Sequence, residues 1–340
     1  MEEPGERTGY PPSRPVRRIL LVVLAALFAL LLVAFLLLVV APALRDPVRF
    51  FTARRSERFE VTFEEAEDRG AALVQPLRVT GYRGPDPGRP GVAFDAYWSR
   101  PVEAEGPSFA VVVLGGIRTG REVMRLVTAR PETARLGVFI TLDYPYDGPR
   151  SFRGLEMLPW IPRVREALFD GVEAVRLAVD FLLSRTEVDP SRIVLLGGSL
   201  GAFYVVDAGA LDHRPAAVVA VMGGGDLTTL FEVNLRSGGY VGTRLLSVPV
   251  AGLLGLLVRP LEPLRLAHLI SPVPYVQISA TGDERIPEAS SRALFESARE
   301  PKRLVWMESA HVLPGREEII EEMIERALAE LRTLDLIDPD

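Results

Sequence analysis

The chain has 340 residues, of which 48% are hydrophobic, and a formal net charge of −6 at pH 7. That length accommodates one large domain or two small ones, and the acidic balance argues against nucleic-acid binding, which requires a basic surface. There is no cysteine, which excludes disulfides, thiolate nucleophiles and zinc–thiolate sites.

The first 40 residues predict a tail followed by a membrane span. Residues 1–18 are rich in proline, glycine and charge, which is typical of disorder. Residues 19–40 then form a run of 22 without a charge, a polar side chain, a proline or a glycine. A helix of that length crosses a bilayer core, so we expect a transmembrane helix here. The alternative is a signal peptide cleaved after Ala41-Pro42-Ala43.

Charge near this run bears on localisation. Arginines flank both of its ends almost equally, and the short tail favours a cytoplasmic N-terminus with the bulk of the chain outside the cytoplasm. Only Lys302 of the 39 basic residues is a lysine, a bias typical of GC-rich bacterial genomes. We therefore expect a single-pass protein of a bacterial cell membrane.

The next stretch predicts a linker and then the edge of a sheet. Residues 41–74 combine an arginine-rich juxtamembrane piece with the alternating segment Phe59–Phe63. Leu77–Thr80 and Val92–Trp98 alternate in the same way, which is typical of antiparallel edge strands. We place the start of the main domain, 75–340, here.

From residue 108 onward, buried strands alternate with amphipathic helices. Helical spacing of apolar residues is clearest near Val164–Leu183 and Glu317–Leu334. The alternation predicts an α/β fold with a mostly parallel central sheet and helices on both faces. The expected strands are Phe109–Leu114, Val138–Leu142, Ile193–Leu196, Ala217–Met222, Tyr275–Ser279 and Arg303–Met307.

Residues 226–269 interrupt this alternation. The segment is apolar and rich in glycine and proline. Arg244 and Arg259 bracket only 14 residues, and Pro249 interrupts them, which argues against a second membrane span. We expect a cap insertion over the active site, with a lipid-facing surface as the alternative.

A serine lies where one of the buried strands meets a helix. Gly197-Gly198-Ser199-Leu200-Gly201 fits the pattern G-x-S-x-G and directly follows the strand Ile193–Leu196. Glycines two residues to either side allow strand and helix backbones to approach, and the serine takes a strained conformation that exposes its hydroxyl. The alternative is a glycine-rich turn with an incidental serine.

A serine nucleophile needs a base, and the chain offers three histidines. Functional groups of a parallel sheet gather at the carboxyl ends of its strands. His213 and His268 each precede a predicted strand, at the opposite edge. His311 follows the strand Arg303–Met307 and is the candidate base.

The same rule selects the acid and the backbone donors. Asp283 follows the strand Tyr275–Ser279 and is the candidate acid, with Asp226 as the alternative and Glu284 as a weaker third. An oxyanion hole needs two backbone N–H groups. We expect these groups from Leu200 and from Gly116 or Ile117.

Three motifs in this order resemble α/β-hydrolases of the dienelactone-hydrolase-like or prolyl-oligopeptidase-like kind. They are Val188–Ala202, Thr281–Glu284 with Ile286-Pro287, and Ser309–Val312, and the likeness covers roughly residues 75–335. It implies a Ser–His–Asp hydrolase that uses no metal or organic cofactor. One departure is Leu114, where many lipases carry the start of a His-Gly motif.

These residues predict a membrane-anchored serine hydrolase that cleaves an ester through an acyl-enzyme, with His311 as base and then acid and Asp283 holding the imidazole. The apolar cap indicates an acyl or otherwise hydrophobic ester substrate. Expected partners are this small or lipid-like substrate and the bilayer, but no nucleic acid. The alternatives are peptidase, thioesterase or acyltransferase activity, and a non-catalytic, membrane-tethered scaffold of the same fold.

Overall fold

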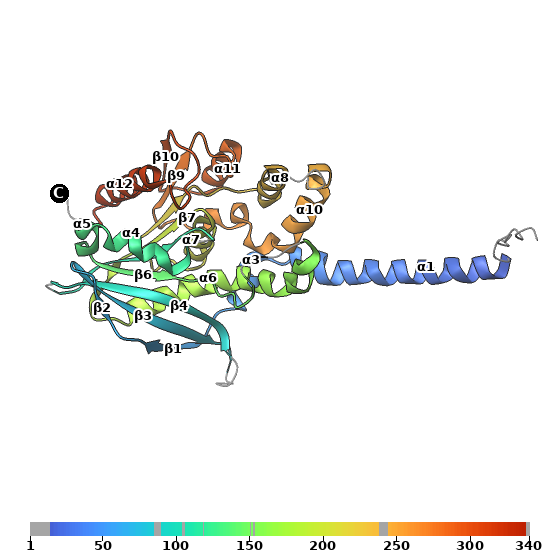
Figure 1. Ribbon diagram of the computed structural model, residues 1–340, viewed down its shortest axis with the longest axis horizontal. Coiled ribbons are helices and arrows are strands. Elements are labelled where there is room, and N and C mark those ends of the chain that lie inside the picture. The colour runs from blue at the N-terminus through green and yellow to red at the C-terminus, as the bar shows by residue number, and fades with distance from the viewer. Residues whose placement is uncertain are drawn as a thin grey trace, which may run out of the picture. The chain divides into compact units, whose positions relative to one another are not determined.

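A computed structural model of the chain describes residues 14–84, 90–103, 106–117, 119–149, 151, 154–237 and 244–337. The chain divides into two compact units, Met1–Leu44 and Arg45–Asp340. The ribbon of each unit can be followed in Figure 1.

The first unit is helical. It contains α1 (Arg14–Phe35), the π-helical turn η1 (Leu36–Val40) and α2 (Ala41–Ala43). The predicted disordered tail is therefore too long at its C-terminal end, because α1 already starts at Arg14; Pro15 lies in the first turn, where proline is tolerated. The rest of that tail, residues 1–13, lies outside the described residues.

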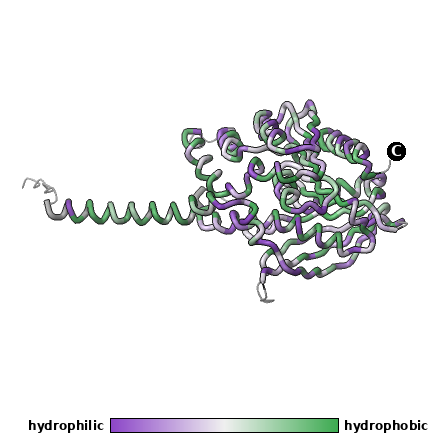
Figure 2. The backbone as a smooth tube through the Cα atoms, turned by 180° about the vertical axis from the view of Figure 1, so that it is seen from behind, coloured by the Kyte–Doolittle hydropathy of each residue, from purple (hydrophilic) through white to green (hydrophobic). Residues whose placement is uncertain are grey.

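The predicted transmembrane helix over 19–40 is not confirmed. Within the described residues, no helix combines the length and the apolar character that crossing a membrane requires. The α1 helix is nevertheless hydrophobic along most of its length (Figure 2), and Leu21, Val22 and Phe28 are each more than half exposed.

Within the described residues, the second unit is built on one sheet of ten strands. Their order is β1-β3-β4-β6-β5-β7-β8-β9-β10, with β2 paired to β3. The strands β1 to β4 pair antiparallel at one edge, whereas β5 to β10 run parallel, as predicted. Their bounds are β1 Arg58–Phe63, β2 Glu67–Asp68, β3 Ala72–Tyr82, β4 Pro90–Pro101, β5 Ser108–Leu114, β6 Val138–Leu142, β7 Val188–Gly198, β8 Ala217–Val221, β9 Tyr275–Ala280 and β10 Lys302–Met307.

Helices cover both faces of this sheet. Successive side chains of a strand point to opposite faces, and β5 divides accordingly. Its residues Ala110, Val112 and Leu114 join one buried cluster with α6 (Ile161–Leu183) and α7 (Leu200–Leu211). Its residues Phe109, Val111 and Val113 join another with α12 (Glu317–Thr333). Each fully buried valine or leucine stabilises the fold by about 1.5–3 kcal/mol.

Short helices complete the domain. They are α3 Pro47–Thr52, η2 Gly120–Val123, α4 Met124–Thr128, α5 Pro131–Arg135, η3 Gly154–Trp160 and α11 Glu288–Ser297.

The predicted insertion 226–269 lies between β8 and β9. Its described parts are α8 (Leu227–Ser237), α10 (Ser247–Leu257) and the turns η4 (Arg259–Leu261), η5 (Pro263–Arg265) and η6 (Ala267–Leu269). Apolar side chains of α8 and of the α10 end form a small core with Phe203 and Ile286, against which Leu200 packs. The insertion therefore lies beside the residue that follows Ser199.

Candidate active site

Ser199 sits in the sharp turn between β7 and α7. Its backbone has φ +54° and ψ −118°, a region that side-chain-bearing residues rarely adopt. A Cβ at Gly197 would lie 2.2 Å from the Gly201 carbonyl oxygen, and a Cβ at Gly201 would lie 2.5 Å from that of Leu114. Both positions therefore require glycine, for the reason the sequence predicts, whereas a Cβ at Gly198 would meet nothing within 4 Å.

The three predicted side chains come together at the carboxyl edge of the sheet. Ser199 Oγ lies 2.8 Å from His311 Nε2, and His311 Nδ1 lies 2.7 Å from Asp283 Oδ2. The side chains of His311 and Asp283 are only 1% and 2% exposed. A neutral imidazole that donates its Nδ1 proton to Asp283 presents Nε2 as an acceptor to the serine hydroxyl.

Backbone groups orient the acid. The Oδ1 atom of Asp283 accepts hydrogen bonds from the N–H groups of Arg285 and Ile286, each at 2.8 Å. This leaves Oδ2 for the imidazole. The other two histidines lie elsewhere: His213 Nε2 contacts the Leu269 carbonyl oxygen at 2.7 Å, and His268 belongs to η6.

The alternative acid, Asp226, is wrong. Its exposed carboxylate caps the start of α8, accepting from Thr229 N at 3.2 Å and from Thr229 Oγ1 at 2.6 Å. A side chain of N-cap type directed into its own helix is not available to the imidazole.

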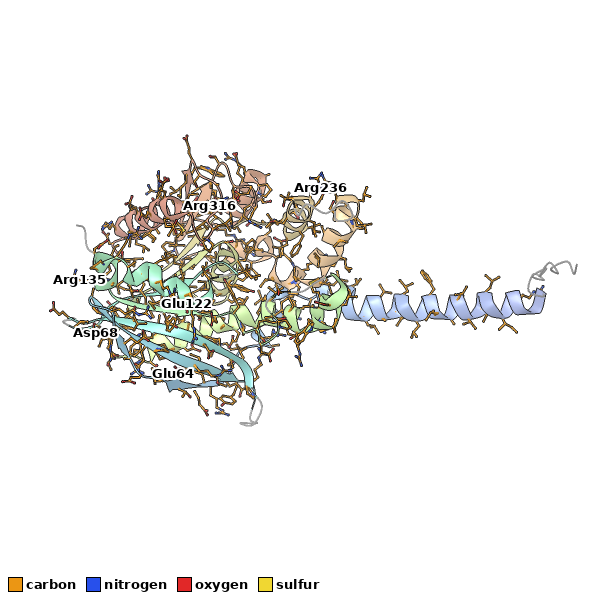
Figure 3. The ribbon with its side chains drawn as sticks, in the orientation of Figure 1. Glu64, Asp68, Glu122, Arg135, Arg236 and Arg316 are labelled. Carbon is orange, nitrogen blue, oxygen red and sulfur yellow. The ribbon has the colours of Figure 1, made fainter. Side chains whose placement is uncertain are left out.

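Glu284 is not an acid for the imidazole either, but it holds the backbone of the histidine. Its Oε2 accepts a hydrogen bond from His311 N at 2.9 Å, and its Oε1 pairs with Arg316 Nη1 at 2.9 Å. Arg316, labelled in Figure 3, also donates to the His311 carbonyl oxygen at 2.7 Å. We refer to Glu284 and Arg316 as the histidine clamp. The sequence reasoning missed Arg316, since no motif or periodicity marks it.

The clamp has an electrostatic signature. Desolvation would raise the pKa of Glu284, but the hydrogen bond from His311 N–H and the neighbouring Arg316 guanidinium outweigh it, and the pKa is lowered. The charged form of Glu284 is therefore the form that the fold stabilises.

Met222 is a second residue that the sequence reasoning missed. It follows β8 with φ +50°, and its fully buried sulfur accepts from Val312 N at 2.9 Å. Through this bond Met222 contacts the backbone of the residue that follows His311. No pattern in the sequence distinguishes it from an ordinary core methionine.

The loop after β5 lies next to the serine. A Cβ at Gly116 would lie 3.8 Å from Ser199 Oγ. The Gly116 carbonyl accepts from Thr119 Oγ1 at 2.9 Å, and the Gly115 carbonyl accepts from the Tyr144 hydroxyl. Leu200 is the first residue of α7, where N–H groups have no partner within the helix. The assignment of the oxyanion donors to Leu200 and to Gly116 or Ile117 stays a prediction.

The described residues contain no cluster of three or more His, Cys, Asp or Glu side chains placed to hold a metal ion. The expectation that the protein uses no metal or organic cofactor likewise stays a prediction.

Solved structures of other proteins show which known fold the chain resembles. No protein-family model matches the chain. The acetyl xylan esterase from Paenibacillus sp. R4 superposes with a TM-score of 0.56 at 20% identity, over 83% of this chain and 92% of that one. Acetyl xylan esterase 1 from Thermoanaerobacterium sp. JW/SL YS485 gives 0.57 at 16% identity, over 86% and 94%. The chain therefore has the α/β-hydrolase fold.

Curated relatives add little about activity. The uncharacterized protein YfhR of Escherichia coli O157:H7 is 30% identical over 130 residues, which are 38% of this chain and 40% of that protein. YfhR of Salmonella typhimurium is 29% identical over 148 residues, 42% and 47%. The chain thus spans less than half the length of the curated relatives it matches.

Proposed function

We propose that the protein is a serine hydrolase that cleaves a carboxylic ester. The observation that carries the proposal is the continuous hydrogen-bonded chain Ser199–His311–Asp283, with distances of 2.8 and 2.7 Å. The similarity in fold to two acetyl xylan esterases supports the same reaction class.

The reaction follows from the roles of these atoms. Ser199 Oγ attacks the ester carbonyl carbon while His311 Nε2 takes the hydroxyl proton. The tetrahedral oxyanion accepts hydrogen bonds from the N–H of Leu200 and from that of Gly116 or Ile117. Its collapse breaks the bond to the alcohol oxygen, which receives the proton from His311. Water, deprotonated by His311, then attacks the acyl carbon, and collapse of this second intermediate breaks the bond to Ser199 Oγ, which takes the proton back from His311. Asp283 stabilises the imidazolium each time it forms.

The substrate is proposed to be an acyl or otherwise hydrophobic ester. The support is the apolar core that α8 and α10 form against Leu200, the neighbour of the nucleophile.

A fluorophosphonate probe tests the reaction class, because it phosphonylates activated serines with loss of fluoride. We expect labelling of the wild type and of Ser191→Ala, a control on the exposed start of β7, and no labelling of Ser199→Ala. Folded wild type that stays unlabelled would instead favour a non-catalytic scaffold. A panel of ester, thioester, peptide and acyl-acceptor substrates then separates esterase from thioesterase, peptidase and acyltransferase activity.

Attachment to a bacterial cell membrane through residues 19–40, with the hydrolase unit outside the cytoplasm, is a separate proposal. Its support is the uncharged sequence and the exposed apolar side chains of α1. Full-length protein should resist carbonate extraction from membranes and be cleaved by protease added to spheroplasts. A mature mass that lacks residues 1–43 would instead identify a signal peptide.

A further inference from the structure

The outer side of α10 and the turn before it is apolar and exposed. Leu245, Leu246 and Val248 are 81%, 58% and 57% exposed, and Val250 and Leu253 are also exposed. We call these five residues the apolar face. On the opposite side of the same helix, Ser247 and Ala251 are buried. A helix that is hydrophobic all round normally lies within a protein core or in lipid, and α10 has protein on one side only.

Three arginines lie near the apolar face. Arg244 precedes it, Arg259 follows α10, and Arg236 extends from α8, where its Nε donates to Ser247 Oγ at 3.2 Å. All three are exposed; Arg236 is labelled in Figure 3 and pairs with Glu232. We call these three residues the arginine rim.

Further positive charge follows in the turns after α10. Desolvation is the main cause that lowers the pKa of Arg265, and the nearby guanidinium of Arg259 lowers it further, whereas Asp46 and Glu262 act in the opposite direction.

The start of the second unit, at Arg45, lies next to the turns that follow α10. Arg265 Nη2 donates to the Arg45 carbonyl oxygen at 3.0 Å, and α3 packs against η4, which directly follows α10. Arg45 and Arg49 are exposed here, as is Asp46, which caps α3 through a 2.8 Å bond to Arg49 N. The segment that precedes Arg45 in the sequence is the apolar helical one.

We propose that the apolar face and the arginine rim form a docking surface for an anionic phospholipid bilayer. The apolar side chains would enter the boundary between headgroups and acyl chains, as interfacial helices do, and the guanidinium groups would pair with lipid phosphates. A second copy of the chain is the poorer occupant, because a two-fold contact through this surface would bring the arginine rim against itself.

Docking would present the candidate active site to the lipid phase, since the inner side of the insertion packs against Leu200. That consequence rests on the proposed ester hydrolysis; the docking itself does not depend on it. A lipid-dissolved ester would then reach Ser199 without crossing bulk water.

The natural chain has no cysteine, so single-cysteine variants of the full-length protein report on chosen positions. We would label Leu246→Cys and Leu253→Cys with an environment-sensitive fluorophore and add vesicles of phosphatidylcholine with or without phosphatidylglycerol. The matched control is Arg326→Cys on α12, a position that is exposed like Leu253.

Docking predicts a blue shift and quenching by spin-labelled lipid at positions 246 and 253, stronger with phosphatidylglycerol, and neither at 326. The double variant Arg244→Glu/Arg259→Glu should lose the dependence on phosphatidylglycerol. Three results would overturn the proposal: no vesicle binding, a response at 246 and 253 no larger than at 326, or a blue shift that appears without vesicles as the chain self-associates. Fluorophosphonate labelling of the same variants is scored separately, so failure to dock and failure to react are distinguishable.

Discussion

The backbone at Ser199 is held in place by its neighbours. Gly197 and Gly201 allow β7, α7 and the end of β5 to approach more closely than any Cβ permits. We therefore expect Gly201→Ala to cost about 1–3 kcal/mol of unfolding free energy and to abolish probe labelling, because the Leu114 carbonyl must move. Gly198→Ala is the control and should keep both properties, since its Cβ meets nothing. Urea denaturation and probe labelling check both variants, and a wild-type-like Gly201→Ala would refute the steric argument.

Replacing aspartate by asparagine should have opposite effects on kcat at positions 283 and 226. Asp283→Asn removes the acceptor that fixes the His311 tautomer, so kcat should fall by about 10⁴-fold with the fold intact. Asp226→Asn keeps a helix-capping side chain and should leave kcat within a few-fold of wild type. Steady-state kinetics on one chromogenic ester compare the two, and equal losses would mean that the acid is assigned wrongly.

The histidine clamp should make the stability of the fold depend on pH in a defined direction. The folded-state pKa of Glu284 is lowered, so its charge contributes stability that is present above the unfolded pKa and lost as pH falls through the folded one. Glu284→Gln keeps an acceptor for His311 N–H but loses the charge. It should therefore be less stable than wild type at pH 7, and the difference should shrink as the solution is acidified below about pH 4.

Thermal melts at several pH values measure that difference, and a constant difference would contradict the assignment. If the clamp also positions the imidazole, the variant lowers kcat more than it raises KM, and Glu284→Asp restores part of the loss.

At the scale of elements, α7 is distinguished by a buried carboxyl group without a hydrogen bond in the part of the chain that the structure describes. It is buried along almost its whole length, and it includes Asp207, which is fully buried, with neither carboxylate oxygen hydrogen-bonded within the described residues. Burial raises the pKa of Asp207 well above its ordinary value, and the nearby Glu262 raises it further. The folded protein therefore holds a proton on this group up to a higher pH than the unfolded chain does.

The consequence of Asp207 has the opposite sign to that of Glu284. Below the unfolded pKa, near 3.9, the group is neutral in both states and costs the fold nothing extra. As pH rises above that value, only the unfolded chain ionises, and the native state loses stability. Asp207→Asn should therefore melt at a higher temperature than wild type at pH 7 to 8, with the gap closing near pH 4. A gap independent of pH would show that Asp207 does not titrate in this way.

Some strands could be predicted from the sequence because both of their faces are buried. The strands β6 and β8 are covered on both faces, so a short run of branched apolar residues marks β6 correctly and β8 to within one residue. The start of β7 was not predictable. Residues Asp189-Pro190-Ser191 look like a turn, yet the strand begins at Val188, because Val188 pairs with Ser108 across a local irregularity in the register.

At the scale of the whole molecule, the sequence could place the active-site edge but not its surroundings. The chain order of Ser199, Asp283 and His311, with strand polarity, was sufficient to bring these side chains to one edge. The histidine clamp and the sulfur of Met222 depend on the paths of two loops, which no periodicity records. Composition identified the insertion as apolar, whereas its division into α8 and α10 depends on how the two helices pack, which composition does not record.

The central claim is that Ser199 is the nucleophile and that His311 activates it. Peptide mass spectrometry of the full-length protein after brief acylation by an activated ester tests it most directly. The account predicts one acyl group, carried by the peptide at Ser199, in the wild type, and none in folded His311→Ala. An acyl group on any other residue of the wild type, or an unmodified Ser199 in folded protein, would contradict it.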